Sequence, residues 1–546
     1  MSRKTESFLR GAMMLSLAAL VSRLLGAFYK PIIARIFAPF DGKMGAVGIG
    51  LTQVPLTTYQ VILSFTSVGL NIGISRLVAE RMALGDSRGA RRVFRVSLTL
   101  MASLGLVASL VMWFGAPWIA GWVSPDLAET VPGFRATAPA LFLTSVMAAY
   151  RGLFQGFQQM SPNALSQIIE QVVRVGSGMV LTYVFVQQSV AQGAAGFNFG
   201  DVLGALAGLL YLLALSYRAG DTLWELPPDA AVDEPRKRHP QESPGRLVRR
   251  ILAVAAPVAV AGAVVPLMMQ ADVFFVFRAL AEAGVGKEDA QAQYGLLTNA
   301  FMIAYLPTVF TSAIYTSLLP AVTRAVTLGQ MAEARRKASQ AYRVTMLLAV
   351  PAQIGLYVLA TGVYALLFGD TSGGQVMAAI SWAVVPIMLQ QTTSGVLQGA
   401  GHIVLPVRNF VIGAVVKALL TAWLTIHYGI SGAAWSSALG FLVAALLNVV
   451  YVEKVLGRTL KTRSMVIKPL LAALAMAGVI YLARFGLGGL LGAGHLATLV
   501  LVAVGGAVYA VVLMLVGGVR LEELEAVPKV GRPLAALLGR RSRVRG

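Results

Sequence analysis

Glu170 and Arg174 are four residues apart inside the apolar stretch NALSQIIEQVVRVGSGMVLTYVFV, residues 163–186. An ionised side chain at the centre of a bilayer costs about 2.5–3.5 kcal/mol on insertion scales, so charges kept there need a reason. One interpretation is structural, because residues at i and i+4 are neighbours on a helix and the two charges would neutralise each other. The other is functional: both residues border a wet cavity, and Glu170 orients Arg174 toward a substrate.

Two further cations lie at a similar depth. At 1.5 Å per residue, Arg23, Arg174 and Lys417 lie roughly 18–20 Å from the cytoplasmic ends of their apolar segments, near the middle of the bilayer. Against Glu170 alone, these residues predict a surplus of positive charge. Such a surplus favours an anionic ligand, and phosphate or pyrophosphate suits arginine especially well. Chloride, or water defects in a thinned membrane, are the alternatives.

Gln155 and Gln398 are weaker candidates for the same cavity. They stand in the paired segments GLFQG (residues 152–156) and GVLQG (residues 395–399). Their side chains could line the cavity, or they could hydrogen-bond a neighbouring helix. The glycines beside them favour close helix packing.

Lys30 and Asp272 complete the set of candidates. Lys30 lies near the end of an apolar segment, where snorkelling to the interface is the default expectation, although it could also reach the substrate. The same default applies to Arg151, Arg278 and Arg408. Asp272 could be a site for a coupling ion or a proton, or it could pair with Arg278 or a backbone donor.

Signatures of catalysis or of a resident metal are missing from the sequence. No GxxxxGK[ST] motif indicates ATP hydrolysis, and no HExxH motif indicates a metalloprotease. The chain has four histidines and no cysteine, which leaves no credible Ser-His-Asp set and no thiolate metal site. We therefore predict no catalytic residue, no metal and no cofactor. Coupling to the membrane potential, H⁺ or Na⁺ would then drive any transport.

The elements that must position these residues are membrane-spanning helices. Of the 546 residues 57% are hydrophobic and 13% charged, whereas soluble domains carry about a quarter charged residues. Apolar runs of roughly 20 residues recur along the chain, as spanning helices require. We predict an all-α polytopic membrane protein with about fourteen spans, at residues 11–33, 45–70, 96–116, 136–156, 162–186, 196–216, 251–276, 294–320, 344–368, 376–398, 404–427, 431–452, 466–486 and 496–518.

Lysine and arginine gather in alternate loops of this arrangement. Basic clusters precede the first predicted span and follow the second, sixth, eighth, twelfth and last spans, whereas residues 117–134 and 187–200 hold no Lys or Arg. By the positive-inside rule, both termini and every basic loop are cytoplasmic. The net charge of +21 then reflects contact with an anionic membrane leaflet, not with nucleic acid.

An internal repeat relates the two halves of the chain. The motif LG-x5-RR, the segments GLFQG and GVLQG, and the triplets VVR and VVK recur at offsets of about 243–244 residues. This offset predicts two pseudo-symmetric lobes of six helices with the same orientation. The predicted parts are an N-lobe, a cytoplasmic linker, a C-lobe, two extra C-terminal helices and a basic cytoplasmic tail, at residues 1–216, 217–250, 251–453, 454–518 and 519–546.

Three segments also carry a resemblance to a known family. RGLFQGFQQMSPNALSQIIEQVVRV (151–175), QADVFFVFRALAEAGVGKEDAQAQYGLLTNAF (270–301) and LPTVFTSAIYTSLLPAVTRA (306–325) resemble the stage V sporulation protein B branch of the polysaccharide and lipid II flippases. These flippases belong to the multidrug/oligosaccharidyl-lipid/polysaccharide exporter superfamily. The resemblance implies two lobes around a central cavity, a lipid-facing groove formed by two extra helices, and an undecaprenyl-pyrophosphate-linked saccharide moved between leaflets.

The resemblance also carries over one residue of the first span. Ser22-Arg23-x-Leu25-Gly26 matches the pattern whose arginine faces the cavity in lipid II flippases. Those flippases tend to carry another arginine six residues later, where this chain has Tyr29 followed by Lys30, and cavity arginines in spans two and eight, which this chain lacks. A lipid-linked glycan other than lipid II is therefore open.

Two other functions stay open on the sequence. One is drug/cation antiport within the same superfamily, whose cationic substrates would favour more buried acids. The other is a non-transporting scaffold for envelope synthesis, which would need no buried surplus charge. In each case we expect a monomer in the bacterial cytoplasmic membrane, surrounded by lipid and in contact with envelope-synthesis proteins.

Overall fold

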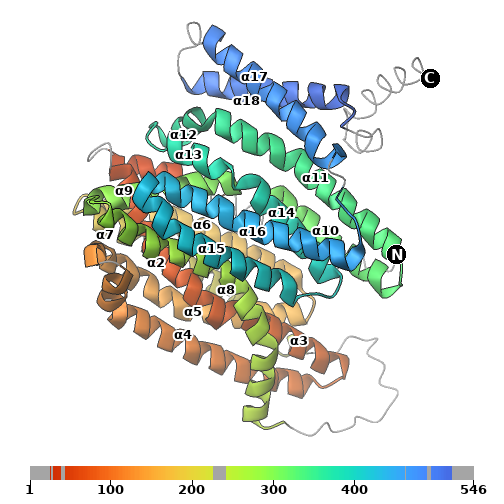
Figure 1. Ribbon diagram of the computed structural model, residues 1–546. Helices are drawn as coiled ribbons and strands as arrows, with labels where there is room; N and C mark the ends of the chain where they lie inside the picture. The colour runs from red at the N-terminus through yellow and green to blue at the C-terminus, as the bar shows by residue number, and fades with distance from the viewer. Residues whose placement is uncertain are drawn as a thin grey trace. The chain divides into compact units, whose positions relative to one another are not determined.

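The computed structural model describes residues 25, 29–38, 44–123, 125–224, 242–460, 463–487 and 494–518. Within these ranges the regular secondary structure is helical (Figure 1). Residues 29–37 form one helical segment, and the remaining elements in chain order are α2 (Met44–Leu63), η2 (Ser64–Val68), α3 (Gly69–Ala83), α4 (Ser87–Val123), η3 (Pro125–Thr130), α5 (Val131–Gly156), α6 (Met160–Phe185), α7 (Val190–Ala219), η4 (Gly220–Trp224), α8 (Pro244–Glu282), α9 (Lys287–Tyr305), α10 (Thr308–Thr327), α11 (Met331–Val358), α12 (Ala360–Phe368), α13 (Gly374–Ser381), α14 (Val384–Gly399), α15 (Val404–Tyr428), α16 (Ile430–Leu456), η5 (Arg463–Ile467), α17 (Lys468–Leu487) and α18 (His495–Leu515).

Eleven helices in the described ranges are long and apolar enough to cross a membrane. Three of the fourteen predicted spans are not among them. The span 11–33 lies mostly outside the described residues. The span 136–156 forms α5, which is long enough but less apolar than the eleven, and the span 294–320 is divided between α9 and α10 at Pro307. Hydropathy therefore located these helices. The polar content of α5 and the break at Pro307 explain why the spans 136–156 and 294–320 are not among the eleven.

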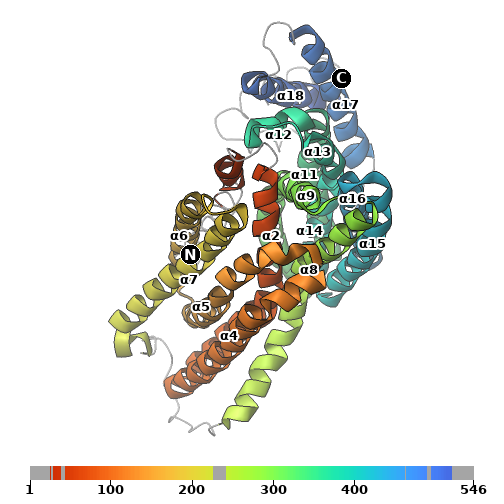
Figure 2. The same cartoon turned by 90° about the vertical axis from the view of Figure 1, so that its left-hand side faces the viewer.

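The chain divides into two compact units. The first comprises Met1–Ile303 with Lys417–Ser436, and the second Ala304–Val416 with Ser437–Gly546. In the first unit α4, α5, α6 and α7 pack along one another, and α4 and α5 lie side by side in both views (Figures 1 and 2). In the second unit α10, α11 and α14 enclose the core, and α17 packs on both α11 and α18.

Glycines bring α6 and α7 into close contact. Four glycines recur every fourth residue along α7, at positions 196, 200, 204 and 208. A Cβ atom added at Gly200 would lie 2.6 Å from the carbonyl oxygen of Arg174, and one at Gly204 the same distance from that of Glu170. Helices in lipid associate through small residues that allow such an approach. The glycine stripe therefore places residues of α7 directly beside Glu170 and Arg174.

The repeated segments make matching contacts within their own units. A Cβ atom added at Gly156 would lie 2.8 Å from the Cβ of Val78. One added at Gly399 would lie 3.0 Å from the Cβ of Val322. Val78 belongs to the hydrophobic core of the first unit and Val322 to that of the second. The prediction that these glycines allow close helix packing is confirmed.

Candidate functional site

Glu170 pairs with Arg151 rather than with Arg174. The turn between α5 and α6 places the two helices next to each other, and Arg151 Nη2 lies 2.7 Å from Glu170 Oε2. Arg151 Nε donates to Ser166 Oγ at 2.9 Å, and Asn163 Nδ2 donates to the Arg151 carbonyl oxygen at 2.9 Å. The i,i+4 ion pair of Glu170 with Arg174, one of the two interpretations of the sequence, is not observed. Arg151, for which snorkelling was the default expectation, pairs with Glu170 instead. The reason is that the neighbouring helix offers each of them a partner at short range.

Arg174 pairs with Asp201, a residue that was not singled out from the sequence. Arg174 Nη1 lies 3.2 Å from Asp201 Oδ1, and the Asp201 side chain is 5% exposed. Asp201 is the one acidic residue of the predicted span 196–216, so its position in an apolar segment was the signal available. Arg174 Nε is buried and has no hydrogen-bond partner, which leaves one donor of the guanidinium available.

Lys417 and Asp272 form a third pair, between α15 and α8. The Lys417 ammonium donates to Asp272 Oδ2, and the Lys417 side chain is 2% exposed. The pairing of Asp272 with Arg278, one of the alternatives, is not observed: Arg278 donates to the Trp122 carbonyl oxygen and lies over the ring of Phe274. Asp272 Oδ1 is buried without a hydrogen-bond partner.

Lys30 is buried, and no carboxylate of the described residues pairs with it. The residue is 7% exposed, so the expected snorkelling to the interface is wrong. Its Nζ donates to the carbonyl oxygen of Thr298 in α9 at 3.2 Å. Among the ion pairs of the described residues none includes Lys30. Within the described part of the chain, the one hydrogen-bond partner found for this ammonium is therefore a neutral carbonyl group.

The two glutamines differ in their surroundings. Gln398 Oε1 accepts a hydrogen bond from the Tyr315 hydroxyl of α10 at 2.5 Å, so it joins two helices. Gln155 is half-buried on α5. Arg23 lies outside the described residues.

A pocket in the described part of the first unit lies away from these charges. It has a volume of about 380 Å³ and is lined by Phe154, Gln159, Ser161, Pro162, Tyr211, Leu215, Ala219 and Thr222. None of the charged candidates contributes to it. Among the described residues no three His, Asp or Glu side chains gather closely enough to hold a metal ion.

Comparison with known proteins gives this geometry its context. The family of polysaccharide biosynthesis proteins matches residues 8–326, which is more than half of the chain. This protein belongs to that family. The stage V sporulation protein B of Bacillus subtilis (strain 168) is 28% identical over 534 residues, covering 96% of this chain and 99% of that protein. The lipid II flippase MurJ of the same organism is 26% identical over 84% of each chain.

Solved structures show the fold of this family member. A lipid II flippase MurJ in an inward closed conformation matches with a TM-score of 0.68 at 14% identity, covering 92% of this chain and 98% of that chain. An inward-facing multidrug resistance MATE family transporter of the MOP superfamily matches with a TM-score of 0.64 at 16% identity, covering 82% and 98%. The chain is therefore a multi-pass, all-helical membrane protein with the fold of MurJ and MATE transporters.

The buried cations of this protein are balanced by more carboxylates than the sequence analysis counted. Arg151, Arg174 and Lys417 each contact a carboxylate. The predicted surplus from Arg174 and Lys417 is therefore neutralised in the described part of the chain, because Asp201 and Asp272 were left out of the count. Lys30 is a buried cation that takes part in no ion pair within these ranges.

Proposed function

We propose that this protein is a flippase that moves an undecaprenyl-pyrophosphate-linked saccharide from the inner to the outer leaflet of the bacterial cytoplasmic membrane. The cargo is a lipid II-like peptidoglycan precursor or another polysaccharide precursor, used for the cell wall or the spore envelope. The family and the similarity to stage V sporulation protein B and to MurJ support this class of cargo. The observation in the chain itself that carries the proposal is the burial of Lys30.

Lys30 is costly to the folded protein unless it binds something. Removing an ammonium from water loses several kcal/mol of solvation, and one carbonyl oxygen returns little of this. An ammonium has three donors, and Thr298 takes one of them. A pyrophosphate oxygen would supply the missing negative charge and accept a second hydrogen bond. We propose that Lys30, together with Arg23, binds the substrate in this way.

Arg174 and Lys417 contact the same substrate in this proposal. The positive charge of each is balanced by a carboxylate, that of Asp201 or of Asp272. A pyrophosphate competes with Asp201 or Asp272 for the cation, and Gln155 and Gln398 contact the saccharide end. Glu170 acts on the site through Arg151. A proton or Na⁺ taken up at Asp272 would release Lys417, which couples substrate binding to an ion gradient.

Alternating access is the mechanism we propose. Fourteen spans form two pseudo-symmetric lobes at residues 1–216 and 251–453, joined by the linker 217–250, with two further helices at 454–518 and a tail at 519–546. The matching contacts of Gly156 and Gly399 support the repeat. Rigid-body rocking of two such lobes exposes a central site to each side in turn. The protein acts as a monomer with membrane lipid and envelope-synthesis proteins as neighbours.

The topology is testable at the two ends of α7. Gln188 precedes the helix and Asp221 follows it, and both are exposed. Because basic residues mark the cytoplasmic side, we expect an impermeant thiol reagent to label Gln188→Cys in intact cells and Asp221→Cys only after permeabilisation. The chain is free of cysteine, so the background is clean. The reverse pattern would contradict the proposed orientation, with both termini cytoplasmic.

A second function in the same superfamily is drug/cation antiport. The carboxylates of Asp201, which is buried, and of Asp272, which is partly buried, would favour it, because they could bind a cation once Arg174 and Lys417 move away. A scaffold without transport is the third possibility. Reconstitution with a labelled polyprenyl-pyrophosphate-linked saccharide separates these functions, since only the flippase moves that lipid.

A further inference from the structure

The helices α3 and α8 approach each other through small residues. Gly69 and Gly73 on α3 face Ala255 and Ala259 on α8, so that a Cβ atom added at Gly73 would lie 3.8 Å from the Cβ of Ala255. At Gly69 the approach is closer still, against the Ala255 carbonyl oxygen and the Ala259 backbone nitrogen. Small residues four apart are the usual means by which helices in lipid come close. In the proposed topology these two helices belong to different lobes, and this contact lies on the cytoplasmic side.

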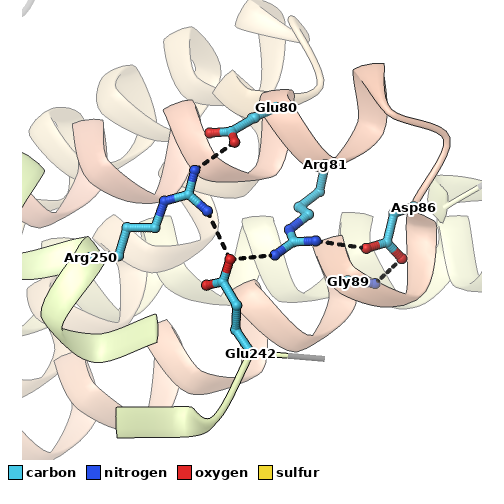
Figure 3. A network of polar contacts seen from close by, with 6 residues as sticks. All are labelled: Glu80, Arg81, Asp86, Gly89, Glu242 and Arg250. Atoms are coloured by element: carbon cyan, nitrogen blue, oxygen red, sulfur yellow. Dashed lines mark hydrogen bonds and ion pairs between the residues drawn. The ribbon is translucent and has the colours of Figure 1, made fainter. Parts of the chain in front are cut away.

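A chain of ion pairs continues this contact beyond the helix pair (Figure 3). Arg250 Nη2 lies 2.5 Å from Glu80 Oε1, and Arg250 Nη1 lies 3.0 Å from Glu242 Oε1. Glu242 also accepts from Arg81 Nη2 at 2.9 Å, and Arg81 Nη1 lies 3.1 Å from Asp86 Oδ2. The network therefore joins the end of α3 to the start of α8. The hydrogen bond from Arg250 to Glu80 is the main cause that raises the pKa of Arg250, which lies outside the candidate spans.

The network is suited to opening as well as to closing. Glu80 and Arg250 are about two-fifths exposed, at 40% and 39%. Partly exposed pairs can separate at little cost in free energy, because water solvates both charges as they part. The side chains are thus able to exchange protein partners for water during each cycle.

A local irregularity in the helix precedes the contact. Residues Ser64–Val68 form a π-helical turn, η2, between α2 and α3, and Gly69 follows it directly. Such turns in otherwise α-helical segments frequently occur at functional sites and bends. The turn gives α3 a place to change direction relative to α2 when the contact with α8 opens.

We infer that the contact of Gly69 and Gly73 with α8, together with the pairs of Arg250 and Arg81, is a releasable latch. The latch closes the cytoplasmic end of the path between α3 and α8. This inference rests on the proposed alternating-access function, because a latch has a role only where the lobes must separate. The π-helical turn is its hinge, and Arg250 is its central cation.

A disulfide can lock the latch. The 3.8 Å between the added Cβ at Gly73 and the Cβ of Ala255 equals the mean Cβ separation in disulfides, about 3.8 Å. In the cysteine-free chain, Gly73→Cys with Ala255→Cys is expected to cross-link on oxidation, to stop translocation, and to regain it after reduction. The control, Gly362→Cys with Thr498→Cys, joins α12 to α18 at a similar Cβ separation of 3.6 Å and should leave translocation intact. Full cross-linking at 73–255 with undiminished translocation would overturn the latch.

The rate of cross-linking tests the latch without any substrate. Arg250→Gln removes two ion pairs, and we expect it to slow cross-linking by about five-fold, because each pair favours the closed state modestly. The matched control is Arg91→Gln, which removes an exposed pair with Asp221 outside the α3–α8 contact and should leave the rate unchanged. If both changes leave the rate unchanged, the network is not a latch. Failure to move the saccharide lipid would refute the proposed function instead.

Spin labels give the same readout if cysteine at Gly73 impairs folding. Arg88 and Arg249 are exposed positions on α4 and α8 beside the network. Nitroxides at Arg88→Cys and Arg249→Cys are expected to report a longer distance population when Arg250→Gln is present. An unchanged distance distribution would count against the latch.

Discussion

Asp201→Asn is expected to lower the free energy of unfolding by about 3–5 kcal/mol, because it leaves the guanidinium of Arg174, whose side chain is only 21% exposed, without its counter-charge. A double variant of Asp201→Asn with Arg174→Gln removes both charges and should recover most of this stability. Chemical denaturation of the detergent-solubilised protein measures both changes. The double variant should fold and yet translocate poorly, because Arg174 is proposed to contact the substrate.

The control for this prediction is an exposed ion pair of the same chemistry. Asp221 pairs with Arg91 at 2.6 Å, but its side chain is 89% exposed. Asp221→Asn should therefore cost about 0–1 kcal/mol. If Asp201→Asn is no more harmful than Asp221→Asn, the Arg174–Asp201 pair does not support the fold.

Lys30→Met is expected to reduce translocation by about 10- to 100-fold while leaving the folded protein as stable as before or more stable. The loss follows from a charged hydrogen bond to the pyrophosphate, worth about 1.5–3 kcal/mol. The gain in stability follows because the variant no longer buries an ammonium with which no carboxylate of the described residues pairs. Lys30→Arg keeps the charge and should retain more activity than Lys30→Met.

Lys468→Met is the matched control for Lys30→Met. Lys468 also donates to a backbone carbonyl oxygen, that of Gly517 at 2.8 Å, but this hydrogen bond is exposed. We expect that variant to translocate normally. A structural lysine would give the opposite signature at position 30, with lost stability and activity that falls only in proportion to the folded fraction. That outcome would remove Lys30 from the binding site.

Hydropathy predicted the helices well because burial in lipid requires long apolar segments. It did not foresee the division at Pro307, where α9 ends and α10 begins, because a span interrupted by proline reads as continuous in composition. The glycine motifs did predict close packing, since at Gly156 and Gly399 any side chain would meet a neighbouring helix. Close helix packing at glycines could therefore be predicted from the sequence, because it depends on the local residue type.

The partners of the buried charges could not be read in the same way. Glu170 and Arg174 are close in sequence, but Arg151 and Asp201 reach them from the helices on either side. The residue that pairs with each charge depends on how α5 and α7 are rotated about their axes, and a single sequence does not give that rotation. Counting Asp201 as a charge inside an apolar span would have shown that Arg174 had an available counter-charge.

Translocation by purified protein in liposomes tests the central claim most directly. Two lipids with the same polyprenyl chain and fluorescent saccharide would be compared, one linked through pyrophosphate and the other through a neutral group. Appearance of the label on the opposite leaflet is measured with an impermeant quencher, with Lys30→Met and empty liposomes as controls. We predict rapid movement of the pyrophosphate-linked lipid by the wild-type protein alone. Equal movement of both lipids, or transport of organic cations with neither lipid moved, would contradict the account.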